Sequence, residues 1–236
     1  MSNATLLEVS DVTVEYVTQG QRFAAISDVT LDIAEGETLG LVGESGCGKS
    51  TTGRAIIQLP TPTAGQVKFE GQELTGLTHN DMRPIRQRLQ IIFQDPVSSL
   101  NPRRRVKDIV AEPLIIDGLK NTAEIDRKVR EVLNAVGMDP DITMDRRPHQ
   151  FSGGQCQRIC IARALIMEPK LIVCDEPVSA LDVSVQAQIL NLLEDMKERY
   201  GLTLLFISHD LAVVKNISDR VAVMYLGKFC ELADSE

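Results

Sequence analysis

The sequence has no long hydrophobic run, no paired cysteine motif and no excess of basic residues. No stretch approaches the ~20 apolar residues of a membrane-spanning helix, and the N-terminus lacks the basic-then-apolar pattern of a secretory signal. The five cysteines form no C-x-x-C pair, so a zinc site or a disulfide framework is disfavoured. The net charge of −8 disfavours non-specific nucleic-acid binding, which needs a basic surface. We expect a cytoplasmic protein without a nucleic-acid partner.

A glycine-rich segment follows the apolar run at residues 38–42. Residues 43–51 read GESGCGKST, the G-x-x-x-x-G-K-[ST] pattern of a phosphate-binding loop between a strand and a helix. In such a loop the backbone N–H groups surround the phosphates, and the helix N-terminus adds partial positive charge. We expect Lys49 to contact the β- and γ-phosphates and Ser50 to bind Mg²⁺. The segment predicts nucleoside triphosphate binding through Gly43, Glu44, Ser45, Gly46, Cys47, Gly48, Lys49, Ser50 and Thr51.

A second apolar run, residues 171–174, ends in two adjacent carboxylates. Asp175 can hold Mg²⁺ through its water shell, and Glu176 can act as the base that polarises the attacking water. The alternative is that both acids only end a strand and cap a helix. The phosphate-binding loop in the same chain favours the catalytic interpretation.

The pattern of apolar residues divides the chain into three parts. Residues 5–42 alternate apolar and polar, which predicts half-buried antiparallel strands. Residues 95–150 show helical patterns broken by five prolines, and after residue 170 short apolar strands alternate with amphipathic helices, as in a parallel sheet covered on both faces. We therefore predict an α/β fold in a single domain, residues 1–236. Its parts are an antiparallel β-subdomain with the first part of the P-loop core (1–94), a helical subdomain (95–165) and the rest of the core (166–236).

Three cysteines lie in informative positions. Cys47 is inside the glycine-rich loop beside Lys49 and a helix N-terminus, and both features favour a reactive thiolate. Cys156 and Cys160 are one helical turn apart and could meet a ligand, although two core or surface thiols are the favoured interpretation.

Residues 151–158 read FSGGQCQR and lead into an apolar helix. A Ser-Gly-Gly turn at a helix N-terminus is a second anion-binding feature, and because one suffices for the chain's own triphosphate, the second suggests contact with a partner's nucleotide. With this segment the sequence resembles the ATP-binding-cassette (ABC) ATPases, whose signature is L-S-G-G-Q, over essentially all 236 residues. The resemblance implies a P-loop NTPase (RecA-like) core with ATP and Mg²⁺ as cofactors.

The resemblance also implies roles for residues outside the phosphate-binding loop. Gln94 matches the glutamine loop, His209 the switch histidine, and Asp182 the loop that crosses to the other subunit. Tyr16 lies about where the family places an aromatic ring that stacks on adenine, and Phe23 is the alternative. The predicted catalytic residues are Glu176, His209, Gln94 and Lys49; the predicted metal ligands are Ser50, Gln94 and Asp175; the signature contacts are Ser152, Gly153, Gly154 and Gln155.

Within the family, residues 93–102, 111–113, 182–186 and 224–227 resemble the subunits that power oligopeptide, dipeptide and nickel uptake in bacteria. This predicts the ATP-hydrolysing subunit of an importer, with peptides favoured, nickel or another small solute as one alternative, and a soluble non-transport ABC ATPase as the other. The implied partners are a second ABC ATPase subunit, two transmembrane permease subunits and, indirectly, an extracytoplasmic solute-binding protein. The implied location is the cytoplasmic face of the inner membrane. Cys156 stands where most relatives have arginine, which predicts a weakened interface or coupling.

Overall fold

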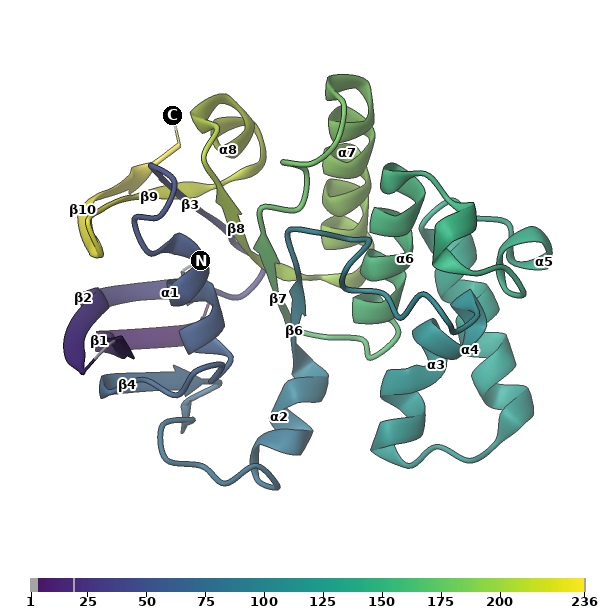
Figure 1. The fold of residues 1–236 in the computed structure, drawn as a ribbon, viewed down its shortest axis with the longest axis horizontal. Coiled ribbons are helices and arrows are strands. Elements are labelled where there is room, and N and C mark those ends of the chain that lie inside the picture. Colours follow the sequence, from purple (N-terminus) through teal and green to yellow (C-terminus); the bar gives the residue numbers. More distant parts are fainter. Residues whose placement is uncertain (1–3, 19, 236) are drawn as a thin grey trace.

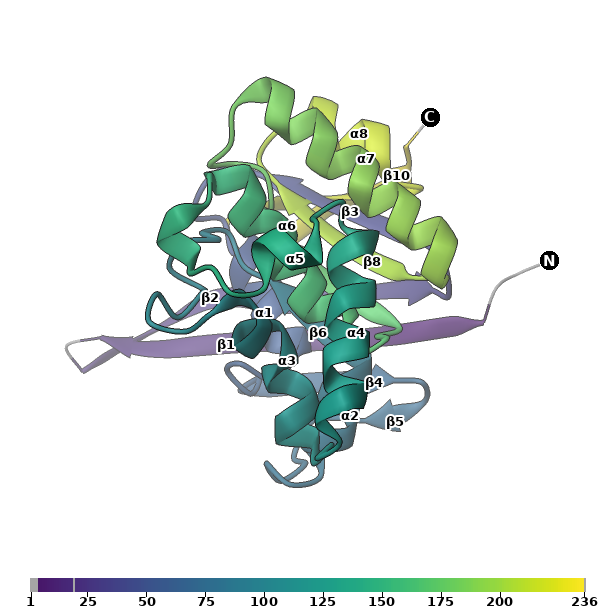
Figure 2. The same cartoon turned by 90° about the vertical axis from the view of Figure 1, so that its right-hand side faces the viewer.

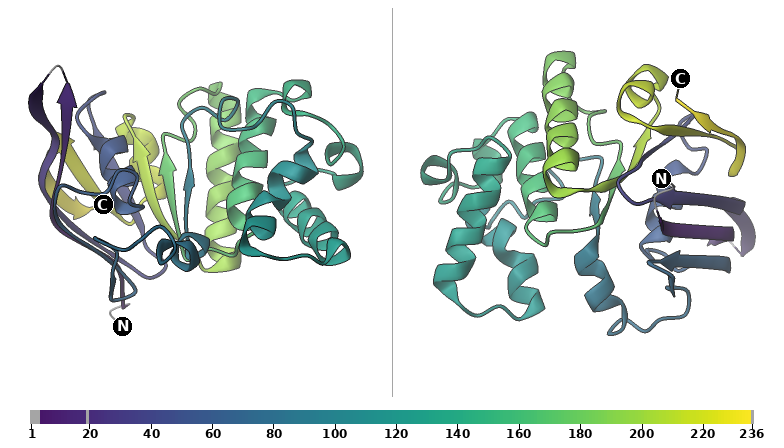
Figure 3. Two further views of the ribbon diagram at one scale, coloured as in Figure 1. Left: turned by 60° about the horizontal axis from the view of Figure 1, so that its bottom comes forward. Right: turned by 180° about the vertical axis from the view of Figure 1, so that it is seen from behind.

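Along the long axis of the protein lie, in this spatial order, an antiparallel sheet, a central and mainly parallel sheet, and a group of helices (Figure 1). The computed structural model describes residues 4–18 and 20–235. Figure 2 views the protein from the helical side, with α3, α4 and α5 in front, and Figure 3 shows the helical group at one end and the antiparallel sheet at the other. No helix within these described ranges is both long and apolar enough to cross a membrane.

The antiparallel sheet has the strand order β2-β1-β4-β5. Its strands are β1 (Thr5–Thr18), β2 (Gln21–Ala34), β4 (Ala64–Phe69) and β5 (Gln72–Glu73). Val9 of β1 is buried while its neighbours Glu8 and Ser10 are exposed, because successive side chains of a strand point to opposite faces. The predicted N-terminal antiparallel subdomain is thus confirmed for residues 5–34.

The central sheet has the strand order β10-β9-β3-β8-β7-β6. Its strands are β3 (Thr38–Gly43), β6 (Leu89–Ile92), β7 (Leu171–Asp175), β8 (Thr203–Ser208), β9 (Arg220–Tyr225) and β10 (Lys228–Asp234). All neighbouring pairs are parallel except β9 with β10. The assignment of residues 38–42 to the antiparallel part was wrong, because this fully buried run pairs in parallel with β8 and β9.

Helices cover both faces of the central sheet. The helix after the phosphate-binding loop, α1 (Lys49–Ile56), lies between the two sheets and contacts strands of each (Figure 1). The remaining helices lie in the helical part or on the face of the central sheet opposite α1. They are α3 (Val106–Asp117), α4 (Thr122–Ala135), α5 (Pro140–Thr143), η1 (Pro148–Gln150), α6 (Gly153–Leu165), α7 (Val183–Tyr200) and α8 (Leu211–Ile217). A further helix, α2 (Met82–Arg88), leads directly into β6.

Two apolar cores meet at the central sheet and explain why its inner strands are apolar throughout. In β7, Leu171 and Val173 belong to the core shared with the antiparallel sheet and α1, whereas Ile172 and Cys174 belong to the core shared with the helical part. Every residue of β7 and β8 is therefore buried. The predicted α/β fold with a parallel sheet, an antiparallel subdomain and an inserted helical part is confirmed.

Candidate functional site

The glycine-rich loop joins β3 to α1 and encloses the side chain of Lys49. The Lys49 Nζ donates hydrogen bonds of 2.8 Å to the carbonyls of Gly43 and Glu44, and the residue is only 3% exposed. Gly48 has φ +111°, and a Cβ there would lie 2.7 Å from a methyl of Ile26. Only glycine fits this position, because the backbone is left-handed and β2 passes close to it.

Two of the predicted metal ligands meet beneath this loop. Ser50, in the first turn of α1, donates from Oγ to Oδ1 of Asp175 at 2.6 Å, although 125 positions separate them. The Arg54 guanidinium lies 3.3 Å from the other oxygen, so the charge of Asp175, which is 1% exposed, is compensated. Sequence reasoning missed Arg54, although its spacing of one helical turn from Ser50 places both on one face of α1.

The donor set suits Mg²⁺. In the described ranges no group of three or more His, Cys, Asp and Glu side chains could hold a metal. The hydroxyl of Ser50 and the carboxylate of Asp175 are adjacent oxygen donors, which fits a cation that keeps several of its waters and takes one or two protein ligands beside substrate phosphates.

Two predicted catalytic residues, Gln94 and His209, contact one carboxylate oxygen of a third, Glu176. The Oε2 atom of Glu176 accepts a hydrogen bond from Gln94 Nε2 at 3.0 Å and lies 3.3 Å from Nδ1 of His209. Glu176 and His209 directly follow β7 and β8, and Gln94 lies two residues after β6. These three strands are neighbours in the sheet, so the topology brings the residues together. Glu176 has φ +48°, and its N–H donates to the carbonyl of Ile207. The strained backbone is held by the adjacent strand and fixes the direction of the side chain.

A cavity of about 400 Å³ opens beside the loop and contains many of the predicted nucleotide contacts. It is lined by Phe23, Ala24, Ala25, Ser45, Gly46, Gly48, Lys49, Ser50, Thr51, Gln94, Glu176, Leu226 and Gly227. Phe23 is in this wall, whereas the favoured candidate for adenine stacking, Tyr16, contacts the Phe23 ring from the neighbouring strand at 5.8 Å between centroids. Sequence reasoning also missed Leu226, which follows β9 and has no polar group to mark it.

The signature residues lie elsewhere, at the start of α6. Ser152 caps this helix by accepting from the Gln155 N–H, and the Gln155 side chain accepts from the Ser152 N–H. A Cβ on Gly154 would lie 2.4 Å from a methyl of Val185, so close packing on α7 requires glycine there. None of residues 152–155, all within the described ranges, lines the cavity beside the loop. Ser152, Gly153 and Gln155 are exposed, as is Asp182, the N-cap residue of α7.

The expected reactive thiol at Cys47 is contradicted by its burial. Its side chain is 5% exposed and packs in the core under the antiparallel sheet, and Cys47 is not among the loop residues that line the cavity. Cys156 is also buried, and burial raises the pKa of its thiol to about 11. Cys156 lies 3.6 Å from the carbonyl of Pro148 and Cys160 lies 3.7 Å from that of Pro96, so they are core thiols rather than a ligand pair.

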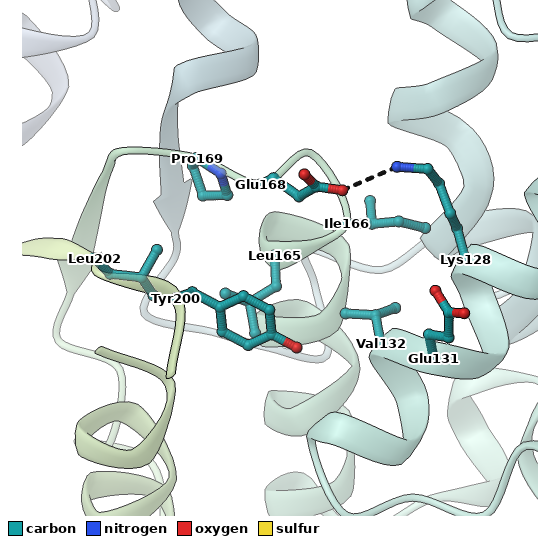
Figure 4. Close-up of a pocket in the computed structure, with 9 residues that line it drawn as sticks. All are labelled: Lys128, Glu131, Val132, Leu165, Ile166, Glu168, Pro169, Tyr200 and Leu202. Carbon is teal, nitrogen blue, oxygen red and sulfur yellow. Dashed lines mark hydrogen bonds and ion pairs between the residues drawn. The ribbon is translucent and has the colours of Figure 1, made fainter. Parts of the chain in front are cut away.

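A second cavity, of about 270 Å³, lies between α4, the end of α6 and the end of α7 (Figure 4). Its rim carries an ion pair of 2.9 Å between Lys128 and Glu168, and Tyr200 forms one wall. None of its lining residues belongs to the predicted nucleotide site.

The fold and the site define a P-loop ATPase. The sequence matches the family described as ABC transporter over residues 26–179. It is 52% identical to a putative peptide import ATP-binding protein of Brucella ovis, over 100% of this chain and 74% of that protein. It is 53% identical to the oligopeptide transport ATP-binding protein OppF of Escherichia coli, over 96% of this chain and 71% of that protein. The chain belongs to the ABC transporter family and is an ABC ATPase.

A solved structure supports the same family. The dimeric post-hydrolysis structure of an ATP-binding cassette bound to ADP and Pi superposes with a TM-score of 0.88 at 29% identity, covering 98% of this chain and 99% of that one.

Proposed function

We propose that this ABC ATPase hydrolyses MgATP to power a bacterial importer of oligopeptides or dipeptides. The observation that carries the catalytic part is the Glu176 carboxylate, held by Gln94 and His209 in the wall of the P-loop cavity. Relatives that share half of the sequence are named for peptide import or oligopeptide transport, which favours peptides over nickel. The same names favour transport over a soluble ABC ATPase.

The geometry supports a role for each side chain in hydrolysis. Lys49, paired with two loop carbonyls, has its ammonium group where it can exchange them for phosphate oxygens. Ser50 and Asp175 would hold Mg²⁺, which neutralises developing phosphate charge when bound. Glu176 takes the proton of the attacking water, while Gln94 and His209 keep its carboxylate in one orientation.

We propose further that the complete site needs a second cassette, identical or related. The signature residues 152–155 are outside the cavity that binds the chain's own nucleotide, yet three of the four are exposed. A helix N-terminus that ends in exposed Ser152 suits the γ-phosphate bound by the facing subunit. Asp182, exposed at the start of α7, belongs to the same interface.

The permease subunits are proposed to bind beside the helical part. A cavity of about 540 Å³ there is lined by Gln94, Asp95, Pro113 and Arg163 among others, and Gln94 also lines the nucleotide cavity. A neighbouring cavity of about 530 Å³ includes Ile116, which is 62% exposed. The two cavities share Gln90 and Pro113, and an exposed apolar side chain in the one and a nucleotide-site residue in the other suit a protein partner that must respond to ATP. We therefore propose that the chain lies at the cytoplasmic face of the inner membrane, with the solute-binding protein as an indirect partner.

The proposal is tested by purifying the chain with the membrane proteins that accompany it and reconstituting the complex in liposomes. We expect ATP-dependent uptake of labelled tri- to pentapeptides in excess of labelled Ni²⁺, and no uptake with Glu176→Gln. Uptake of Ni²⁺ alone would contradict the peptide assignment. Failure of any membrane protein to accompany the chain through purification would favour the soluble alternative.

The two-cassette mechanism needs a separate measurement. With hydrolysis blocked by Glu176→Gln, MgATP should convert monomers into dimers, with itself or with a related cassette, as followed by light scattering. Ser152→Arg should prevent this conversion, because a bulky cation then replaces the exposed helix cap at the interface. Full activity of a strictly monomeric Ser152→Arg protein would exclude the composite site.

A further inference from the structure

The turn between β9 and β10 places an apolar side chain in an unfavourable backbone conformation. Leu226 has φ +46° and Gly227 has φ +79°, which makes a two-residue hairpin connection of the kind that prefers Asn-Gly. Within residues 4–18 and 20–235, the other non-glycine residues with positive φ are all Asp, Glu or Gln. A bulky leucine is strained there, and it is also 76% exposed, so it gains little from packing within the chain.

The turn is fixed against the nucleotide site. The Gly227 N–H donates to the carbonyl of Cys47 in the phosphate-binding loop at 2.8 Å, and the Ser27 N–H donates to the Gly227 carbonyl at 2.9 Å. A Cβ on Gly227 would lie 2.8 Å from the carbonyl oxygen of Ala25, so the turn packs directly on β2. Figure 1 shows the β9–β10 hairpin beside β2, close to α1.

The exposed leucine therefore stands in the wall of the cavity that also contains Phe23 and the loop. The residues that can surround phosphates belong to the loop, whereas Leu226 and Phe23 offer only apolar surface. An apolar wall in a nucleotide cavity suits the base and ribose, which gain free energy when their surface is removed from water.

We propose that Leu226 is a nucleoside-binding residue, whose side chain packs on the base or ribose of the bound nucleotide. This inference rests on the nucleotide site of the proposed function. It explains why a strained, exposed leucine occupies a turn for which asparagine is better suited: the strain is offset by contact with the ligand rather than by contacts within the chain. An apolar contact of this kind strengthens nucleotide binding without selecting one base by hydrogen bonds.

The test replaces the leucine with the residue that the turn prefers and measures affinity and stability together. In Leu226→Asn, MgADP should bind about five- to tenfold more weakly, as expected for the loss of part of a leucine contact. The Tm without nucleotide should rise by about 2–4 °C, because the backbone strain is relieved. Binding of magnesium pyrophosphate, measured by displacement of a fluorescent ADP analogue, should be unchanged.

Two control variants distinguish the loss of an apolar contact with the nucleotide from general effects of changing a leucine in this hairpin. Leu226→Met keeps an apolar side chain and should retain MgADP affinity, whereas Leu232→Asn changes an exposed leucine of the same hairpin that does not line the cavity and should also leave affinity unchanged. Unchanged MgADP affinity in Leu226→Asn would overturn the inference. An equal loss for pyrophosphate would overturn it too, by showing that the turn acts through the loop backbone. If the unmodified chain bound neither ligand, the nucleotide site itself would be misassigned.

Discussion

Glu176→Gln separates the chemistry of the site from its architecture. The substitution keeps the shape of a side chain that is 12% exposed and removes its charge and its capacity to take a proton. The glutamine carbonyl can still accept the hydrogen bond that Gln94 donates at 3.0 Å to Glu176, because the amide can rotate to present its oxygen. The Glu176 N–H bond to Ile207 involves only the backbone and is unaffected. The folded structure should therefore persist.

The expected loss of turnover in Glu176→Gln is much larger than the expected loss of stability, so the two effects can be told apart. A hydrogen bond to a charged acceptor contributes ~1.5–3 kcal/mol and a neutral one ~0.5–1.5, so the loss at this solvent-accessible pair should stay near 1 kcal/mol. For a chain of this size that lowers Tm by about 2–4 °C. Removing a general base slows turnover by about 10²–10⁴-fold, which corresponds to ~2.7–5.5 kcal/mol in the activation barrier. The loss of activity thus greatly exceeds any loss of folded protein at 25 °C.

The assay measures phosphate release, MgATP affinity and Tm for the same preparations. Glu168→Gln is a matched control. Glu168 also has positive φ, +52° against +48° for Glu176, and it lines the cavity between α4, α6 and α7 rather than the nucleotide cavity. We expect the control to retain activity and Glu176→Gln to bind MgATP normally while hydrolysing it slowly. Turnover above about one tenth of the unmodified rate would refute the assignment of Glu176 as the base.

Three further predictions concern packing, adenine and thiols. Gly154→Ala should lower Tm by about 3–10 °C, because the new methyl would lie 2.4 Å from a methyl of Val185 in the contact between α6 and α7. Adding Val185→Ala should restore the Tm, and a double variant that stays destabilised would contradict this cause. Tyr16→Ala should weaken ATP affinity about 10–100-fold and Tyr16→Phe hardly at all; a larger loss in Phe23→Ala would assign stacking to Phe23, which lines the cavity. In the folded protein one thiol, Cys230, should react rapidly with iodoacetamide, because the other four are buried; Cys230→Ser should abolish the fast phase, and its persistence would contradict the burial.

Short segments of the sequence determined the chemistry of this protein. The phosphate-binding loop, the Asp175–Glu176 pair and the Ser-Gly-Gly turn are each contiguous, so their spacing shows which backbone and side-chain groups stand together. The alternation of residues 5–34 likewise predicted the antiparallel sheet, because successive residues of a half-buried strand are alternately apolar and polar. A fully buried strand has no such alternation, which is why β3 was placed in the wrong sheet.

The tertiary structure alone decided which distant residues share the site and which nearby ones do not. Gln94, Glu176 and His209 meet because β6, β7 and β8 are neighbours, an order that no local pattern specifies. Cys47 lies within the loop yet faces the core, since the direction of a side chain depends on what packs around the backbone. Leu226 enters the site only because a hairpin at the opposite end of the chain is hydrogen-bonded to the loop. Such contacts depend on packing between segments far apart in sequence, and they cannot be predicted from the spacing of residues along the chain.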